Sequence, residues 1–410
     1  MSALIHAATL VTAGVYLLLR SSPLLEHAPI ALTVITWTGA LTTLYGAATG
    51  LVQSDLKRVI AFSTCSQVGL MIMAVGLSQY APSLFHLVQH AALKALLFLS
   101  AGSVIHACAD QQDLRHLGGL LGQMPFTYTA LLIGSLSLIA TPFLSGHYSK
   151  DSILETAAGA FSLSGTGGFI LGTLGATLTA FYSVRLLAMT FLTGPNGPKV
   201  QYTGSHEAPF MLGLPLVILS VISITGGYLG RDLFLGMGTD GLSHALWVQP
   251  LANTLVDADF GLPQLVKLLP FLGTLAGALS ATVLYLLMPK TVLSLTDAGA
   301  GAYRFLMGKW QWDAVVTNLF IGPGLTAGSV LSVSVDKGFV ELVGPHGLTG
   351  LLPSTAGAVG RTNDSALVTT QALIMLVGLL AFMVAASGSH WGGLVVLFAT
   401  LTVFLMTDRR

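Results

Sequence analysis

The sequence predicts an all-α, polytopic membrane protein whose transmembrane helix bundle has nine or ten spans, one of them broken. Of the 410 residues, 53% are hydrophobic and only 8% are charged, whereas charged residues make up roughly 25% of soluble domains. Apolar windows of about 20 residues, long enough to cross a bilayer, recur between polar or Gly/Pro-rich segments. The 17 basic and 17 acidic residues leave no net charge that would indicate a nucleic-acid partner.

Nine apolar windows are interpreted as spans, and a tenth is expected near the C-terminus. The first has no basic leader region and no small-residue cleavage site, so we interpret it as a mature helix rather than a cleaved signal. Cys65 and Cys108 show neither metal-ligand nor disulfide spacing and are interpreted as small core residues. The windows lie near residues 2–19, 28–51, 59–78, 83–108, 126–160, 167–192, 210–230, 266–288 and 366–386, with the tenth near 391–407.

The fifth window, 126–160, is too long for one crossing and contains the segment ATPFLSGHYSKDSILE. Pro142 and the Ser-Gly pair after it interrupt the helical pattern, because proline removes a backbone hydrogen bond and clashes with the preceding turn. Lys150, Asp151 and Glu155 follow at once. We therefore expect two half helices joined by unwound backbone, an arrangement that often frames ion or substrate sites in membrane proteins.

Basic residues in the loops support this layout, because lysine and arginine favour the cytoplasmic or matrix side of a membrane protein. When consecutive loops are assigned to alternate sides, nine basic residues fall on one side and three on the other. The nine are Lys57, Arg58, Arg115, Lys199, Lys290, Arg304, Lys309, Lys337 and Arg361; the three are Arg20, Arg231 and Lys267.

His86, His90 and Lys94 lie four residues apart in the otherwise apolar window 83–108. Residues spaced by four share one face of a helix, so the three side chains form a single polar stripe. A lysine near the middle of a membrane helix costs roughly 2.5–3.5 kcal/mol on insertion scales, and such groups usually face the protein interior along an ion or proton path. On energetic grounds alone Lys94 and Lys150 are the functional candidates, whereas the histidines alone would be interpreted as structural.

Residues 290–365 have a different composition, with apolar residues interleaved with Gly, Asp, Lys and Pro. We expect no window in them to stay uncharged long enough for a comfortable span. The segment KWQWDAVVTNLFIGPGLTAGSVLSVSVDKGFVELV is amphipathic enough to lie along the membrane surface or on neighbouring helices. A long loop with short helices is an equally good interpretation of this pattern.

Four motifs occur in order along the chain: SALIHAATLVTAGVYL at 2–17, SDLKRVIAFSTCSQVGLMI at 54–72, HLVQHAALKALLFLSAGSVIH at 86–106 and SKDSILE at 149–155. Together they closely resemble the antiporter-like proton-channel subunits of respiratory complex I, most strongly the subunit 5 branch. The resemblance implies proton translocation, coupled to NADH oxidation and quinone reduction elsewhere in the complex. A subunit of a multisubunit sodium/proton antiporter is the alternative, and the buried lysines argue against a third interpretation, a purely structural scaffold.

The later segments KWQWDAVV and VDKGFVELV resemble the C-terminal extension of subunit 5. This resemblance implies a long lateral amphipathic helix and a C-terminal anchoring helix. Family members carry two inverted repeats, so we expect most of the first repeat on a separate chain, with a truncated sequence as the alternative. The implied domains are 1–27, the last helix of the first repeat; 28–192, the second repeat or half-channel; 193–302, additional transmembrane helices; 303–365, the lateral helix region; and 366–410, the anchor.

The resemblance assigns seven residues to a proton path. They are His6 as the connection between half-channels, Lys57 where protons enter, His86 and His90 as relay neighbours, Lys94 as the central lysine, Lys150 as the exit lysine and Asp151 as the acid beside it. Three roles stay open. His106 is interpreted as interfacial or hydrogen-bonded, Glu155 as part of the path or a helix cap, and Arg185 as snorkelling to the interface or pairing with Glu155 or Asp151.

The resemblance implies no cofactor in this chain. FMN, iron–sulfur clusters, NADH and quinone are expected in other subunits. The expected partners are other membrane-arm subunits of complex I, a separate chain carrying the N-terminal half of the subunit, and membrane lipids, without nucleic acid. The expected location is the mitochondrial inner membrane, as a multi-pass protein, with a bacterial plasma membrane as the alternative.

Overall fold

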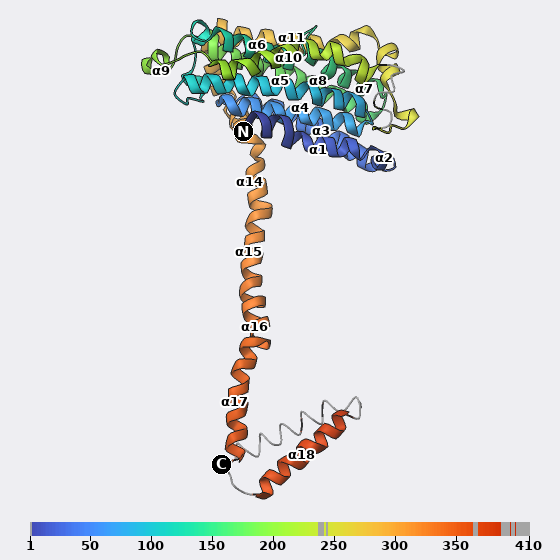
Figure 1. Cartoon of the computed structure of the whole chain (residues 1–410), viewed down its shortest axis with the longest axis vertical. Helices are drawn as coiled ribbons and strands as arrows, with labels where there is room; N and C mark the ends of the chain where they lie inside the picture. Colours follow the sequence, from blue (N-terminus) through green and yellow to red (C-terminus); the bar gives the residue numbers. More distant parts are fainter. Residues whose placement is uncertain are drawn as a thin grey trace. The chain divides into compact units, whose positions relative to one another are not determined.

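The computed structural model describes residues 2–236, 242, 245–363, 368–386, 394 and 398 (Figure 1). It divides into two compact units, Met1–Trp312 and Asp313–Arg410. Apart from one isolated β-bridge between Asp55 and Asp113, the regular structure in the described part of the chain is helical. The all-α, polytopic fold is therefore confirmed.

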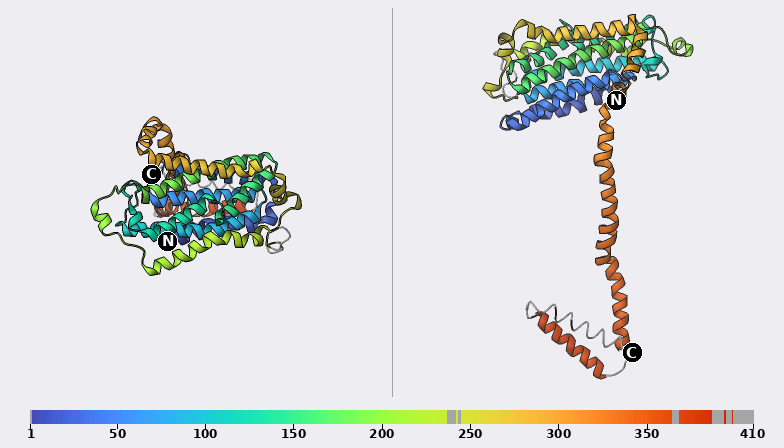
Figure 2. Two further views of the ribbon diagram at one scale, coloured as in Figure 1. Left: turned by 90° about the horizontal axis from the view of Figure 1, so that it is seen from above. Right: turned by 180° about the vertical axis from the view of Figure 1, so that it is seen from behind.

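The first unit is a bundle of helices whose axes run side by side (Figure 2). Elements labelled η have a π-helical or 3₁₀ backbone. In chain order the elements are η1 Ser2–Thr9, α1 Leu10–Arg20, α2 Ser22–Leu25, α3 Pro29–Gly50, α4 Leu56–Gly76, α5 Tyr80–Ala107, η2 Leu114–His116, η3 Leu120–Gly122, α6 Pro125–Ile139, η4 His147–Asp151, α7 Ser152–Gly159, α8 Leu163–Leu187, η5 Ala188–Leu192, α9 Lys199–Thr203, α10 Phe210–Leu235, η6 Pro250–Ala252, η7 Asp257–Gly261, α11 Gln264–Thr282, η8 Val283–Leu287, α12 Pro289–Ala298, α13 Ala300–Met307 and η9 Lys309–Gln311.

The predicted spans of this unit correspond to helices of membrane-crossing length and apolar composition. Within the described residues these are Ala3–Arg20, Pro29–Gly50, Leu56–Gly76, Tyr80–Ala107, Leu163–Leu192, Phe210–Leu235 and Gln264–Leu287. The window predicted at 126–160 forms the broken helix. The window at 366–386 forms α18, Val368–Ala386, in the second unit. The tenth window, 391–407, lies outside the described residues except for positions 394 and 398.

The ends of α3, α4, α5 and α8 meet at one end of the bundle. The backbone N–H of Leu56 donates to the Gln112 carbonyl at 2.9 Å, and Arg185 Nη1 donates to the Leu51 carbonyl at 2.7 Å. Four basic residues predicted to share one side of the membrane lie on the segments that meet here: Lys57, Arg58, Arg115 and Lys199. We call this end the basic side.

Helices α3 and α4 approach each other through glycine. Thr43 N lies 2.6 Å from the position that a Cβ at Gly69 would take, and Ser66 N lies 2.7 Å from that position at Gly46. Small residues at four- and seven-residue spacing allow this close backbone approach in membrane bundles. The approach fixes α4 against α3, so that polar residues of α4 point to α5.

The broken helix is confirmed. Helix α6 ends at Ile139, and Ala140 and Phe143 adopt positive φ angles of 71° and 70°. The helix resumes at His147 in the π-helical turn η4 and continues as α7 to Gly159. Such π-turns are frequent at functional sites.

The second unit continues the chain as a long helical run followed by α18. Its elements are α14 Trp312–Val316, η10 Thr317–Ile321, α15 Gly322–Leu331, η11 Ser332–Val340, α16 Glu341–Val343 and α17 Pro345–Asn363. The long-loop interpretation is therefore wrong. The expectation that no window stays uncharged is also wrong, because residues 314–335 contain no charged residue. By length and composition the run Lys309–Ala358 could itself cross a membrane, and its lateral placement stays a prediction.

Candidate functional site

Three buried side chains of α5 form the centre of the candidate site. His86, His90 and Lys94 are 2%, 0% and 0% exposed, and the rings of His86 and His90 lie 6.0 Å apart between centroids. The stripe therefore faces the interior of the bundle, as its spacing predicts. Polar groups at this depth are costly unless they serve an ion or proton path, so their burial supports a functional interpretation.

Lys94 is held by α4. Its Nζ donates a hydrogen bond to the Ser63 hydroxyl and lies 3.4 Å from the Ile60 carbonyl oxygen. Both partners are neutral, and within the described residues Lys94 forms no ion pair. A buried charge without a counter-ion is strongly disfavoured. Whether Lys94 is charged therefore depends on stabilisation of its ammonium group by neighbouring groups and water.

His86 connects α4 with the broken helix. Its Nε2 lies 3.1 Å from Gln67 Oε1 on α4, and its Nδ1 lies 3.0 Å from Ser149 Oγ on η4. When Nε2–H donates a hydrogen bond to the Gln67 oxygen, Nδ1 of the neutral ring accepts a hydrogen bond from the Ser149 hydroxyl. Both partners are buried. Neither Gln67 nor Ser149 is marked by a spacing in the sequence, although both lie inside the quoted motifs and Ser149 directly precedes Lys150.

His90 lies between His86 and Lys94 along α5. Neither of its ring nitrogens has a hydrogen-bond partner within the described residues. Buried polar groups are nearly always bonded to protein or to ordered water. The two ring nitrogens of His90 are therefore candidates for hydrogen bonds to buried water.

Lys150 lies in the turn that restarts the broken helix and is 2% exposed. Its Nζ donates to the Leu138 carbonyl at 3.4 Å, in the last turn of α6, where carbonyl groups lack a partner within the helix. The negative end of the α6 dipole favours an ammonium group at this position. The break thus creates a site for a buried cation that an uninterrupted helix would lack.

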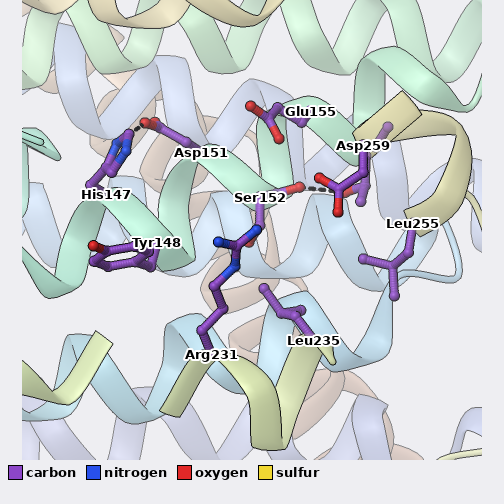
Figure 3. A pocket seen from close by; sticks show the side chains of 11 residues that line it. His147, Tyr148, Asp151, Ser152, Glu155, Arg231, Leu235, Leu255 and Asp259 are labelled. Carbon is purple, nitrogen blue, oxygen red and sulfur yellow. Dashed lines mark hydrogen bonds and ion pairs between the residues drawn. The ribbon is translucent and has the colours of Figure 1, made fainter. Parts of the chain in front are cut away.

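Asp151, the next residue, points into an open pocket with a cavity volume of about 160 Å³. Its Oδ2 lies 2.6 Å from His147 Nδ1, one turn earlier. Figure 3 shows Arg231 reaching into the pocket from α10, across from the carboxylates of Asp151 and Glu155. Glu155, whose role the sequence left open, therefore lines the same pocket.

This pocket lies at the end of the bundle opposite the basic side. Its lining includes Leu255 and Asp259, from a segment anchored beside the α4–α5 turn, where Gln79 Nε2 donates to the Ala252 carbonyl at 2.7 Å. Adjacent residues on the broken helix thus face in two directions. Lys150 is buried against the end of α6, and Asp151 faces the open pocket.

The structure does not join His6 and Lys57 directly to this row. His6 is exposed on η1, and its ring lies 6.1 Å from Phe98, one turn beyond Lys94 on α5. Lys57 lies in the first turn of α4, where its backbone N–H donates to the Asp55 carboxylate cap at 2.9 Å. Lys57 is partly exposed on the basic side, one turn before the Lys94 contact.

The structure limits the possible roles of His106 and Arg185. His106 is exposed at the end of α5, where its ring packs edge-on against that of His206 at 5.7 Å between centroids. This position agrees with an interfacial role. The suggested pairing of Arg185 with an acidic residue of the broken helix is wrong: Arg185 binds the Leu51 carbonyl and lies over the Tyr285 ring instead.

Comparison with known proteins gives a consistent result. The family described as "NADH:quinone oxidoreductase/Mrp antiporter, TM" matches residues 1–179. The chain is 57% identical to NADH-ubiquinone oxidoreductase chain 5 of Cryptococcus neoformans var. grubii over 384 residues, covering 93% of this chain and 58% of the relative. The chain resembles the antiporter-like subunit family. Members from Cryphonectria parasitica and Marchantia polymorpha, both also NADH-ubiquinone oxidoreductase chain 5, are 45% and 44% identical to it.

The relatives are longer than this chain. It covers 63% of the Cryphonectria protein with its whole length, and 57% of the Marchantia protein with 93% of its length. The chain therefore spans about three fifths of the curated relatives it matches. The stripe on α5 and the complete broken helix both fall within the segment that the family match covers.

Proposed function

We propose that this chain translocates protons in the membrane arm of respiratory complex I. The observation that carries the proposal is the row of buried polar groups from Lys94 on α5, through His86 and Ser149, to Lys150 at the break. The similarity to proteins named NADH-ubiquinone oxidoreductase chain 5 supports coupling to NADH oxidation and quinone reduction. Those reactions would occur in other subunits, with FMN and iron–sulfur clusters there.

The row suits stepwise proton transfer. A histidine accepts a proton on one ring nitrogen and releases one from the other, so His86 can pass charge between its two neighbours without leaving its place. The Ser149 hydroxyl can donate one proton while it accepts another, and water between Ser149 and the adjacent Lys150 would extend the row to that lysine. Release then proceeds through Asp151 and His147 into the open pocket. Working against about 150 mV requires roughly 3.5 kcal/mol per proton, which the redox reactions supply.

A sodium/proton antiporter subunit is the second candidate, because the family description includes such antiporters. The relatives with the quoted identities favour complex I. We further propose the mitochondrial inner membrane as the location, and the other membrane-arm subunits as partners. The part of the relatives that this chain does not match would be supplied by a separate polypeptide or by the same one.

Purification in mild detergent tests the proposal. We expect the chain to co-purify with NADH-oxidising activity and with FMN- and iron–sulfur-containing subunits, and the vesicles from which it was purified to acidify on one side when NADH is added. Mass spectrometry of the same sample identifies the polypeptide that carries the remaining family segment. Recovery only with other antiporter subunits, without NADH oxidation, would exclude the complex I assignment.

Ser149→Ala is expected to lower the number of protons moved per NADH oxidised by roughly tenfold, because it removes the buried hydrogen bond of about 1.4 kcal/mol that joins His86 to the broken helix. The measurement is dye-reported acidification of sealed vesicles alongside NADH absorbance. Ser100→Ala is the matched control, since Ser100 is equally buried and bonds only to the backbone of its own helix, at 2.7 Å. Equal coupling in the two variants would remove Ser149 from the path.

Asp151→Asn is expected to slow proton release by roughly tenfold, because the neutral amide can no longer take a proton from the path or pair with protonated His147. The initial rate of vesicle acidification under saturating NADH reports this step. Asp257→Asn is the control, since Asp257 is exposed and near this pocket without lining it. An acidification rate in Asp151→Asn that matches the control would place the outlet elsewhere.

A further inference from the structure

Five buried polar side chains lie near the ends of α3 and α8 on the basic side. Each has one polar atom without a hydrogen-bond partner among the described residues. They make up half of the ten such atoms in the described part of the chain: Thr49 Oγ1, Gln53 Nε2, Tyr182 Oη, Ser183 Oγ and Arg185 Nε. Each of these residues is at most 6% exposed. Leaving a buried polar atom unsatisfied costs about 1–3 kcal/mol, so five together point to water within this part of the bundle.

These residues connect with the central lysine. The Tyr182 ring lies against Gly50 at the end of α3. Its hydroxyl faces Ser63, the residue that accepts a hydrogen bond from Lys94, as well as Gln67 and Thr179, without a hydrogen bond of standard geometry. Tyr182 therefore sits between the Lys94 contact and the end of α3.

Thr49 and Gln53 lie between Tyr182 and the surface of the basic side. They are four residues apart, and the turn between them is held by the hydrogen bond from the Val52 N–H to the Thr49 carbonyl at 3.4 Å. Gln53 is 3% exposed and lines a polar cavity of about 600 Å³ on the basic side. The unpartnered amide nitrogen of Gln53 thus lies where the buried set meets the surface.

The mouth of this cavity is charged. Asp55, Asp110 and Asp113 line it together with Arg58 and Arg115. Arg115 lies 2.6 Å from Asp113 and holds the pKa of that carboxyl below its usual range, so Asp113 stays ionised at neutral pH. Lys57 does not line the cavity. A charged, solvent-accessible cavity next to these buried polar side chains is suited to taking up protons and water.

We propose that this cavity and the side chains of Gln53, Thr49 and Tyr182 form a water-filled inlet that carries protons from the basic side to Lys94. The ligand is water with its excess proton. Each step moves one proton between water or hydroxyl oxygens, and the last step places it on Nζ of neutral Lys94, so no other reactant is required. The inlet deepens the proposed function, because it supplies protons to the lysine at the head of the row.

Side-specific cysteine labelling tests the inlet independently of pumping. In a background with Cys65→Ser and Cys108→Ser, Thr49→Cys and Gln53→Cys are treated with a small charged methanethiosulfonate from either side of sealed vesicles holding the assembled complex. Because only a hydrated thiol ionises and reacts, we expect labelling from the basic side at least roughly tenfold faster than for Ala47→Cys, a fully buried residue two positions earlier on α3. Equal, slow labelling of all three variants would overturn the proposal.

Pumping by the labelled complex then tests the role of the hydrated passage. Adding the charged adduct to Thr49→Cys from the basic side is expected to lower protons moved per NADH by roughly tenfold compared with the same variant before labelling. Labelling without any loss of pumping would show that the passage is wet but carries no protons, which overturns the inlet. Labelling does not depend on Lys94, so failure of the proposed function and failure of the inlet give different results.

Discussion

Replacing Lys94 by methionine is expected to abolish proton translocation by the assembled complex, with a loss of at least about tenfold in protons moved per NADH. Methionine keeps the length of the side chain but has no proton to transfer and cannot donate to Ser63. Because Lys94 has no charged partner within the described residues, its removal leaves no unpaired buried carboxylate. The variant should therefore fold and assemble. Acidification of sealed vesicles, normalised to NADH oxidation, measures the effect.

Lys199→Met is the matched control for this experiment. Lys199 carries the same charge but is exposed at the start of α9 on the basic side. A general effect of removing one positive charge would appear in both variants. Undisturbed pumping in Lys94→Met would take this residue out of the path, whereas loss in both variants would indicate that charge at the basic side, rather than the row, limits translocation.

The stripe and the break could be predicted from the sequence because each depends on local rules. Helical spacing places His86, His90 and Lys94 on one face, and the energetics of the bilayer require that face to be buried. Pro142 removes a backbone hydrogen bond and clashes with the preceding turn, and together with the Ser-Gly pair that follows it marks the break locally in the sequence. Neither prediction needs knowledge of which helix lies opposite.

The partners of these residues could not be predicted in the same way. Gln67 and Ser149 meet His86 from segments 19 and 63 residues away along the chain, and a serine or glutamine in an apolar window has no spacing that marks it. The contacts of Tyr182 could not be predicted either, because an aromatic residue in a spanning helix usually packs in the core. Of the two alternatives left open for Arg185, pairing with an acidic residue is wrong, and its contact with Leu51 could not be predicted because it is to a backbone carbonyl.

The long helical run was misjudged for another reason. Its two aspartates, Asp313 and Asp336, lie at the ends of an uncharged stretch of 22 residues, 314–335. Frequent glycine and proline in that stretch suggested loops, yet both are tolerated in membrane helices more than in soluble ones. Composition over the whole of 290–365 therefore concealed a local window that could span a bilayer.

Gly69→Ala is expected to destabilise the whole first unit, because the row depends on α3 and α4 staying in close contact. A Cβ at this position would lie 2.6 Å from the Thr43 N and 2.8 Å from the Gly39 carbonyl oxygen, both backbone atoms that cannot rotate away. The helices would have to separate, which costs about 3 kcal/mol or more, a large fraction of the 5–15 kcal/mol that stabilises a typical domain. We expect a strong fall in the amount of assembled complex.

Quantitative immunoblotting of the membranes and the temperature at which the detergent-solubilised chain aggregates measure this effect. Gly102→Ala is the control, because nothing lies within 4 Å of a Cβ at that position on α5. Separation of α3 from α4 also moves Ser63 and Gln67, which α4 presents to Lys94 and His86. Any Gly69→Ala complex that does assemble should therefore pump fewer protons per NADH than the Gly102→Ala complex. Normal assembly with normal coupling would mean that the row does not require this helix contact.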